Sequence, residues 1–207
     1  MKKIMFNDRY GLTAAVLQGR KTMTRRICKE YATGQLILAS DVESFLFYPK
    51  NNIVKFLMKD GTIKVSVPPY KDNEVVVVAQ SYKSIHEEMT NGDYGDSKYD
   101  AFRCAMVAGT KGWSNKMFVR PDLMPHQIQI TDINIEHLQN ISDEDCMKEG
   151  IMYNNEVGFE NGCYYFNDYE GFKTPKSAFC TLINRINGKS SWEINPFVFA
   201  YSFKLIH

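Results

Sequence analysis

The residues best suited to chemistry lie in a basic stretch at residues 20–26. Three arginines and one lysine fall within this stretch: Arg20, Lys21, Arg25 and Arg26. The whole chain has a formal net charge of only +1, so any attraction to a polyanion must come from local clustering. Guanidinium groups bind phosphate oxygens through paired N–H donors. The stretch therefore predicts a site for nucleic acid or a nucleoside, with a surface salt-bridge network as the alternative.

Other residues could contribute to the same site. Trp113 and Arg120 lie in an irregular segment that could line a cleft, where an indole can stack on a base. Trp192 and the aromatic residues of 197–203 recur at strand spacing, which favours a core role over base stacking. We therefore add only Trp113 and Arg120 to the predicted binding residues.

Composition excludes several classes of protein. The five cysteines include no C-x-x-C pair, and the four histidines are scattered, so we expect no disulfide framework, metal site or cofactor. The first seven residues are too short an apolar stretch for a signal peptide, and no run approaches a membrane span. We expect a cytoplasmic protein without a membrane partner. The sequence leaves the oligomeric state open.

Hydrophobic patterning predicts many short strands and a few short helices. The predicted strands are residues 4–6, 53–58, 63–67, 74–79, 127–135 and 197–205. The predicted helices are residues 9–18 with Asp8 as the cap, residues 142–150 starting at Ser142, and residues 177–186. The Asp60–Gly61 step between two apolar runs predicts a hairpin.

Two polar, glycine-containing segments interrupt this pattern, at about residues 83–115 and 152–172. We interpret them as insertions in a single domain that covers residues 1–207. The strand-rich pattern predicts an α+β or mainly β fold, such as a small mixed β-barrel, but pattern alone does not separate one barrel type from another.

The chain resembles the ASCH-domain family of the PUA-like superfamily, specifically a longer branch associated with phages and prophages. The opening G-x-K-x-x-T-x-R motif is matched by Gly19, Lys21, Thr24 and Arg26. Three later blocks follow in the same order: Trp113 with Pro121 and Met124-Pro125, residues 138–151 (LQNISDEDCMKEGI), and residues 192–199 (WEINPFVF). The resemblance covers most of the chain outside the two insertions. It implies a PUA-like mixed β-barrel with a cleft beside the first helix.

A related branch removes the acetyl group from the exocyclic amine of acetylated cytidine. Carried over by motif, its Lys, Thr and Glu correspond to Lys21, Thr24 and Glu149, which should then meet in one pocket. Threonine is a poor nucleophile until a base takes its proton, and lysine is such a base only when burial or nearby cations lower its pKa. The ordinary alternatives are a solvated lysine, a structural threonine and a solvent-facing glutamate.

The chain departs from that branch at two places. Gln80 and Ser81 stand where the branch has an Arg-Glu pair, and His126 follows Met124-Pro125 in place of an arginine. Both departures remove charge from the expected cleft and put the substrate in question.

Three functions therefore remain open. The first is a module that binds nucleic acid, RNA rather than DNA, or a modified nucleoside through the basic stretch. The second is an amidohydrolase that uses Lys21, Thr24 and Glu149. The third is a phage-associated interaction protein whose insertions contact a partner.

Overall fold

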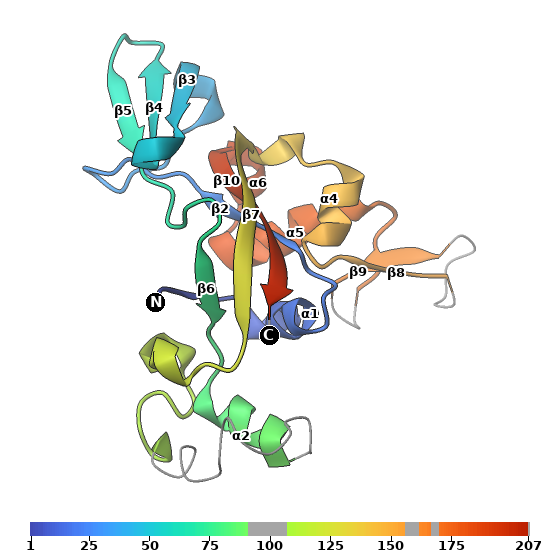
Figure 1. Ribbon diagram of the computed structural model, residues 1–207. Helices are drawn as coiled ribbons and strands as arrows, with labels where there is room; N and C mark the ends of the chain where they lie inside the picture. Colours follow the sequence, from blue (N-terminus) through green and yellow to red (C-terminus); the bar gives the residue numbers. More distant parts are fainter. Residues whose placement is uncertain (91–106, 156–161, 167–169, 207) are drawn as a thin grey trace.

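A computed structural model describes residues 1–90, 107–155, 162–166 and 170–206. At its centre lies a five-stranded sheet in the order β1-β6-β7-β10-β2 (Figure 1). These strands are β1 (Lys3–Ile4), β6 (Val75–Val78), β7 (Gln127–His137), β10 (Phe197–Ile206) and β2 (Met23–Ile27). β1 runs parallel to β6, and the other neighbours are antiparallel. The predicted α+β class, rich in strands, is confirmed.

The predicted closure of the sheet into a barrel is not found. β1 and β2 form opposite edges of an open sheet. β1 is only two residues long, so it offers few backbone groups for a closing ladder. A side chain spans the gap instead, because Nη2 of Arg26 donates to the carbonyl oxygen of Met5 at 2.7 Å. Met5 and Arg26 both line a cavity, described below, that separates the two edges.

The long strands β7 and β10 carry the core. In β10, Phe197, Phe199, Tyr201 and Phe203 are all buried, as their spacing predicts. β10 pairs with β2 on one side and with β7 on the other, with a register shift at Ser202. Residues of a second, three-stranded sheet, described next, and of several helices belong to the same apolar cluster.

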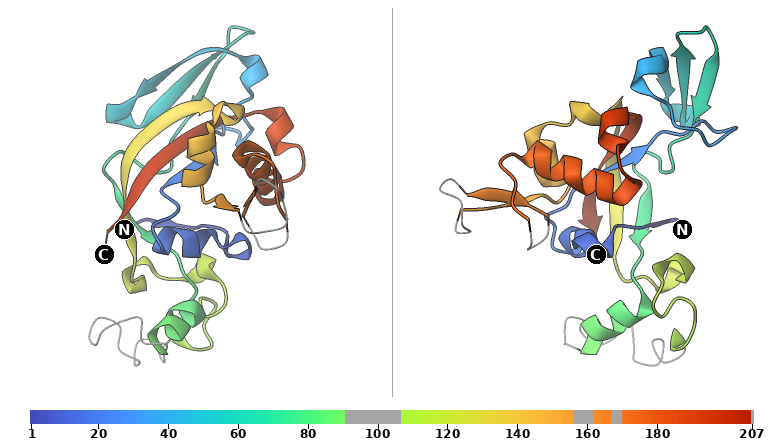
Figure 2. Two further views of the ribbon diagram at one scale, coloured as in Figure 1. Left: turned by 90° about the vertical axis from the view of Figure 1, so that its right-hand side faces the viewer. Right: turned by 180° about the vertical axis from the view of Figure 1, so that it is seen from behind.

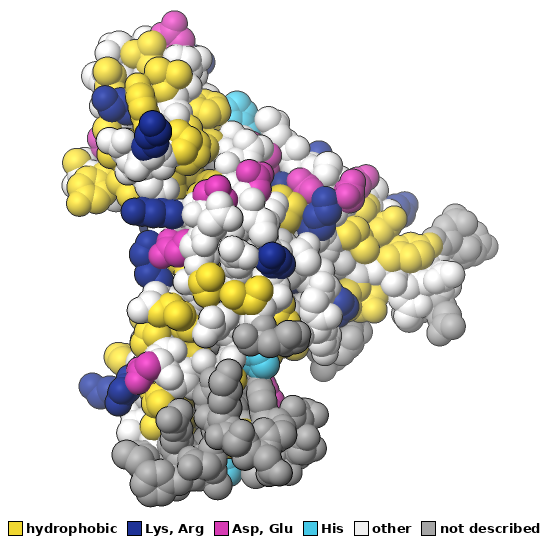
Figure 3. Space-filling view, in the orientation of Figure 1, with side chains coloured by type: hydrophobic (Ala, Val, Ile, Leu, Met, Phe, Trp, Pro, Cys, Tyr) yellow, Lys and Arg dark blue, Asp and Glu magenta, His cyan; other side chains and the backbone are white. Residues whose placement is uncertain are grey.

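A separate three-stranded sheet contains β3 (Val42–Tyr48), β4 (Ile53–Met58) and β5 (Ile63–Ser66). The hairpin predicted at Asp60–Gly61 joins β4 to β5, and Gly61 supplies a positive φ of 82°. The sheet projects from one end of the molecule (Figures 1 and 2). Phe56 connects it to the main core, with its ring centroid 5.0 Å from that of Phe197. Apolar side chains are visible on its surface (Figure 3).

Most of the helices gather on one face of the central sheet (Figure 2). They are α4 (Asp143–Lys148), α5 (Pro175–Asn187) and α6 (Ser191–Ile194), while α1 (Leu12–Leu17) lies near the chain ends. The predicted start of α4 is confirmed, because Oγ of Ser142 accepts from the Asp145 amide at 3.1 Å. The predicted helix at residues 177–186 lies within α5, whose capping box is formed by Thr174 and Ser177.

The predicted single helix at residues 9–18 is wrong. A 3-10 turn, η1 (Asp8–Tyr10), is followed by Gly11 at a φ of 65° and only then by α1. Asp8 therefore caps nothing in α1, and its carboxylate binds Nζ of Lys116 at 2.7 Å. The left-handed glycine ends the turn before a longer helix can form.

The predicted insertions contain short elements: α2 (Tyr82–Thr90), β8 (Met152–Asn154) and β9 (Cys163–Tyr165). Parts of both insertions, residues 91–106, 156–161 and 167–169, lie outside the described residues. The remaining 3-10 turns are Ala39–Asp41, Pro49–Asn51, Lys116–Phe118, Pro121–Leu123 and Leu138–Asn140. Tyr82 belongs to a second, smaller apolar cluster with residues such as Ile85 and Val119.

Within the described ranges, no helix is long and apolar enough to cross a membrane. The same part of the chain holds no group of three or more His, Cys, Asp or Glu side chains suited to a metal ion.

Candidate functional site

A cavity of about 360 Å³ lies between the segment that follows β1, β2, α5 and the end of α4. Lys21, Thr24 and Glu149 all line it, which confirms the expected convergence of these three residues. Polar groups come from β2 and the segment before it, and α5 provides an apolar wall. That wall consists of Phe179, Leu182, Ile183 and Ile186, spaced as one face of a helix.

Lys21 is almost completely buried, with 2% of its surface exposed. Its position follows from the end of α1, where the Lys21 amide donates to the carbonyl oxygen of Ala15 at 2.9 Å. Its Nζ donates to Oε2 of Glu149 at 2.5 Å and to the backbone oxygen of Glu149 at 2.7 Å. The lysine is therefore held at two points by a single residue.

Glu149 reaches this position because it ends α4. It is the C-cap of that helix, and Gly150 follows with a φ of 104° that turns the chain away. The Thr22 amide donates to the carbonyl oxygen of Lys148 at 2.9 Å, which ties the segment before β2 to the last turn of α4. Residues 128 positions apart in sequence are thus brought into hydrogen-bond distance.

Arg25 occupies the other side of Glu149. Its Nη1 donates to Oε1 of Glu149 at 3.2 Å, and its Nη2 donates to Oδ2 of Asp145 at 3.1 Å. Its Nε donates to Oε1 of Glu136 at 2.8 Å. The guanidinium is almost fully buried, with 1% of the side chain exposed. Three carboxylates therefore occupy the donors that sequence analysis assigned to phosphate.

Burial and charge act in opposite directions on the two cations. Burial lowers the pKa of the Lys21 amine; Glu149 opposes this shift, Arg26 and Arg25 add to it, and the net pKa is lowered. Burial also acts to lower the pKa of Arg25, but the carboxylates of Glu149 and Glu136 outweigh it and raise that pKa. Arg25 is thus a permanent cation, while the Lys21 ammonium gives up its proton more readily than that of a lysine in water.

Thr24 and Arg26 complete the polar side of the cavity. Thr24 is buried and pairs with Tyr201 across the β2–β10 ladder. Arg26 lies with its guanidinium carbon 5.8 Å from the centre of the Phe6 ring. Its Nε is buried and has no hydrogen-bond partner within the described part of the chain. Such a donor is costly unless a ligand or water satisfies it.

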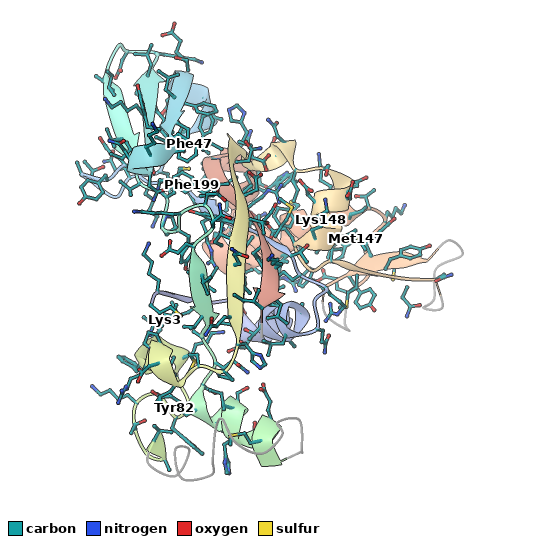
Figure 4. The ribbon with its side chains drawn as sticks, viewed as in Figure 1. Lys3, Phe47, Tyr82, Met147, Lys148 and Phe199 are labelled. Atoms are coloured by element: carbon teal, nitrogen blue, oxygen red, sulfur yellow. The ribbon has the colours of Figure 1, made fainter. Side chains whose placement is uncertain are left out.

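The remaining predicted site residues do not line this cavity. Arg20 is exposed and donates to Oε1 of Gln18, and Arg120 forms an exposed ion pair with Asp122. Trp113 packs against the second apolar cluster, with its ring 5.8 Å from that of His86. Figure 4 labels Tyr82 of that cluster at the lower end of the molecule, well apart from Met147 and Lys148 of α4.

The two departures from the family pattern also fall outside the cavity. Gln80 is buried beside α2, where its Nε2 donates to Oε1 of Glu88 at 2.6 Å. His126 lies 4.0 Å from the same carboxylate group. The expectation that these changes remove charge from the cleft is therefore not met by this cavity.

Sequence reasoning missed Glu136, Asp145 and the apolar wall of α5 as parts of the site. The wall carried a signal in its i, i+3, i+4, i+7 spacing, although that spacing indicates a core face as readily as a ligand wall. Glu136 and Asp145 carried none, because their role depends on contacts more than a hundred residues away in sequence.

Comparisons of the chain with family models, with curated proteins and with solved structures gave no significant match. The resemblance to the ASCH family therefore remains a prediction.

Proposed function

We propose that this chain is an ASCH-like amidohydrolase that removes an acyl group from the exocyclic amine of a small nucleoside-like base. One observation carries the proposal. A buried lysine, held by a buried glutamate at 2.5 Å, lines the same cavity as a buried threonine. A solvated lysine and a surface glutamate, the ordinary alternatives, do not fit this burial.

The two hydrogen bonds of Lys21 suit a general base. A neutral amine has two N–H donors and one lone pair. Both donors are directed to Glu149, one to its carboxylate and one to its backbone oxygen. The lone pair is then free to accept a proton, and the lowered pKa of Lys21 favours this neutral form.

The reaction follows from these roles. The Thr24 hydroxyl attacks the acyl carbonyl carbon while Lys21 takes its proton. The tetrahedral intermediate then breaks the C–N bond, and the leaving amine takes the proton from the Lys21 ammonium. The neutral Lys21 amine then deprotonates a water molecule, which attacks the carbonyl carbon of the Thr24 ester. The ester C–O bond breaks, the Thr24 oxygen takes the proton from the Lys21 ammonium, and the carboxylic acid leaves. Arg26 Nε is a donor available to a substrate oxygen.

A second candidate is binding of a modified nucleoside without turnover. The Nε of Arg26, which has no partner among the described residues, favours it, because this donor would bind a carbonyl or phosphate oxygen whether or not chemistry follows. The charges favour a small ligand over a polymer in either case, since Arg25 is neutralised internally and neither Arg20 nor Arg120 lines the cavity.

A panel of N-acylated nucleosides, unmodified nucleosides, tRNA and single-stranded DNA tests these candidates. We expect release of the carboxylic acid from one acylated nucleoside, and a loss of at least about 100-fold in kcat/KM for Lys21→Met and Thr24→Val. Lys189→Met and Thr33→Val, both at exposed positions, are the matched controls and should keep full activity. Binding of nucleosides by the wild type without any turnover would instead support the second candidate.

A further inference from the structure

The charged side chains around the cavity form an inner and an outer set. The inner set is buried and consists of Lys21 with Glu149; the outer set consists of the buried Arg25 with the half-buried Glu136 and Asp145. Of these five residues, Arg25 alone connects the two sets, because it donates hydrogen bonds to Glu149 and to both outer carboxylates. Its neighbours come from two elements: β7 supplies Glu136, and α4 supplies Asp145 and, at its C-cap, Glu149.

Each oxygen of the Glu149 carboxylate has its own cation. Oε1 accepts from Arg25 at 3.2 Å, and Oε2 accepts from Lys21 at 2.5 Å. A carboxylate with one oxygen fixed by a rigid guanidinium cannot rotate about its terminal bond without breaking that contact. Arg25 therefore fixes the plane of the Glu149 carboxylate. That plane in turn sets the direction of the hydrogen bond from Lys21 to Oε2.

We propose that Arg25 is a positioning residue, which holds the Glu149 carboxylate so that its second oxygen orients Lys21 for proton transfer. This inference rests on the proposed function of the cavity. It assigns Arg25 to the support of the general base rather than to phosphate binding, and the outer carboxylates to the support of Arg25.

The surroundings of Lys21 determine what removal of Arg25 should do. The charged groups that act on the amine are Glu149, Arg26 and Arg25. Cys146 of α4 adds no charge at neutral pH, because burial raises the pKa of its thiol to about 12. Removing the Arg25 cation takes away one charge that repels the Lys21 ammonium. Of the two cations that bind the Glu149 carboxylate, only Lys21 then remains. The Lys21 ammonium should then be more stable than in the wild type.

The test measures the titration of Lys21 directly, by NMR of protein carrying ¹³C at the lysine ε-carbons, with Lys21→Met to assign the signal. In Arg25→Met we expect the pKa of Lys21 to rise by about one unit. Arg25→Lys, which keeps the charge, should leave it within a few tenths of a unit of the wild type. Arg120→Met, which removes an exposed arginine outside the cavity, is the matched control and should change nothing.

A second measurement follows turnover. The acid limb of the kcat/KM profile should move to higher pH in Arg25→Met, because more of the base is then protonated at any given pH. Arg25→Lys should keep the wild-type limb but lose about 10- to 100-fold in kcat, because a lysine cannot make the same set of bonds.

The NMR arm does not depend on knowing the substrate, so failure of the proposed function and failure of this inference can be told apart. An unchanged Lys21 titration in a folded Arg25→Met protein overturns the inference. If Arg25→Met does not fold, Arg25→Lys decides: kcat equal to that of the wild type would show that the bonds of Arg25 do not position the base.

Discussion

At the scale of single residues, the central feature is a lysine buried against a glutamate. Burying an ion pair gives little net stability, because the cost of removing both charges from water offsets their attraction. The pair of Lys21 and Glu149 is therefore poorly explained as a stabilising contact. It is better explained by what a desolvated lysine can do, since burial lowers the pKa of the amine and so favours its neutral form.

This account predicts a pH-dependent contribution of Lys21 to folding. A lysine whose pKa is lowered in the folded state binds fewer protons there than in the unfolded chain. Burying Lys21 therefore costs the least free energy above pH 10.5, the pKa of this lysine in the unfolded chain. The cost grows as the pH falls toward the lower pKa of the folded state. The free energy of unfolding of the wild type minus that of Lys21→Met should rise with pH in this window, by at most about 1.4 kcal/mol per pH unit.

Urea unfolding of both proteins at several pH values up to 10.5 measures the difference. Taking the difference cancels the titration of Cys28 and Tyr201, whose pKa values are raised by burial in both proteins. A difference that stays flat or falls with pH would mean that Lys21 keeps its charge when folded, and it would remove the general base from the proposal.

At the scale of elements, the end of α4 does the positioning. Gly150 turns the chain directly after Glu149, with a φ of 104° that side chains rarely adopt. A methyl group at this position would lie 3.3 Å from Cδ2 of Leu12 and 3.7 Å from Cβ of Lys21. The glycine is thus packed against α1 and against the lysine itself, so a side chain here would strain the backbone and push against Leu12.

We therefore expect Gly150→Ala to lower stability by about 1–3 kcal/mol through backbone strain and crowding, and to lower kcat through displacement of Glu149. Gly34→Ala is the matched control: Gly34 also has a positive φ, of 72°, but open space around it. It should cost about 1–2 kcal/mol and leave kcat unchanged. Equal kcat for the two variants, measured alongside thermal unfolding, would show that Gly150 has no role in the geometry of the site.

Local elements were predictable from the sequence because their signals are local. The Asp60–Gly61 hairpin, the Ser142 cap and the alternation in β10 each depend on a few neighbouring residues. The break at Gly11 was missed because a single glycine in an apolar stripe is compatible with a continuous helix. The open sheet was missed because closure depends on which edges meet, and strand pattern says nothing about that.

The same distinction applies to the site. The motif at Lys21 and Thr24 predicted which residues meet in the cavity, because a resemblance supplied the partner Glu149. The arginines were predicted as a group from their density, but density does not show where each side chain points. Arg25 points inward to three carboxylates, and Arg20 lies outside the cavity. Only tertiary contacts separate these roles.

At the scale of the whole molecule, the distribution of charge fits the proposed small-molecule site better than a site for a polyanion. The net charge is +1, and Arg25, the most buried arginine among the described residues, is neutralised by three carboxylates. Within the described part of the chain, the cationic side chains that line the cavity besides Lys21 and Arg25 are Arg26 and Lys29. Two such groups suit one polar or singly charged ligand better than the many phosphates of a strand.

The most direct test of the central claim is to trap the acyl group on the protein. Wild-type protein is mixed with the acylated nucleoside that it turns over, quenched in acid within milliseconds and digested with trypsin. We predict the mass of one acyl group on the peptide of residues 22–25, with fragment ions that place it on Thr24 rather than Thr22. Thr24→Val should lack the adduct and the turnover. Turnover that persists in Thr24→Val, with no acylated peptide from the wild type, would contradict the proposed mechanism.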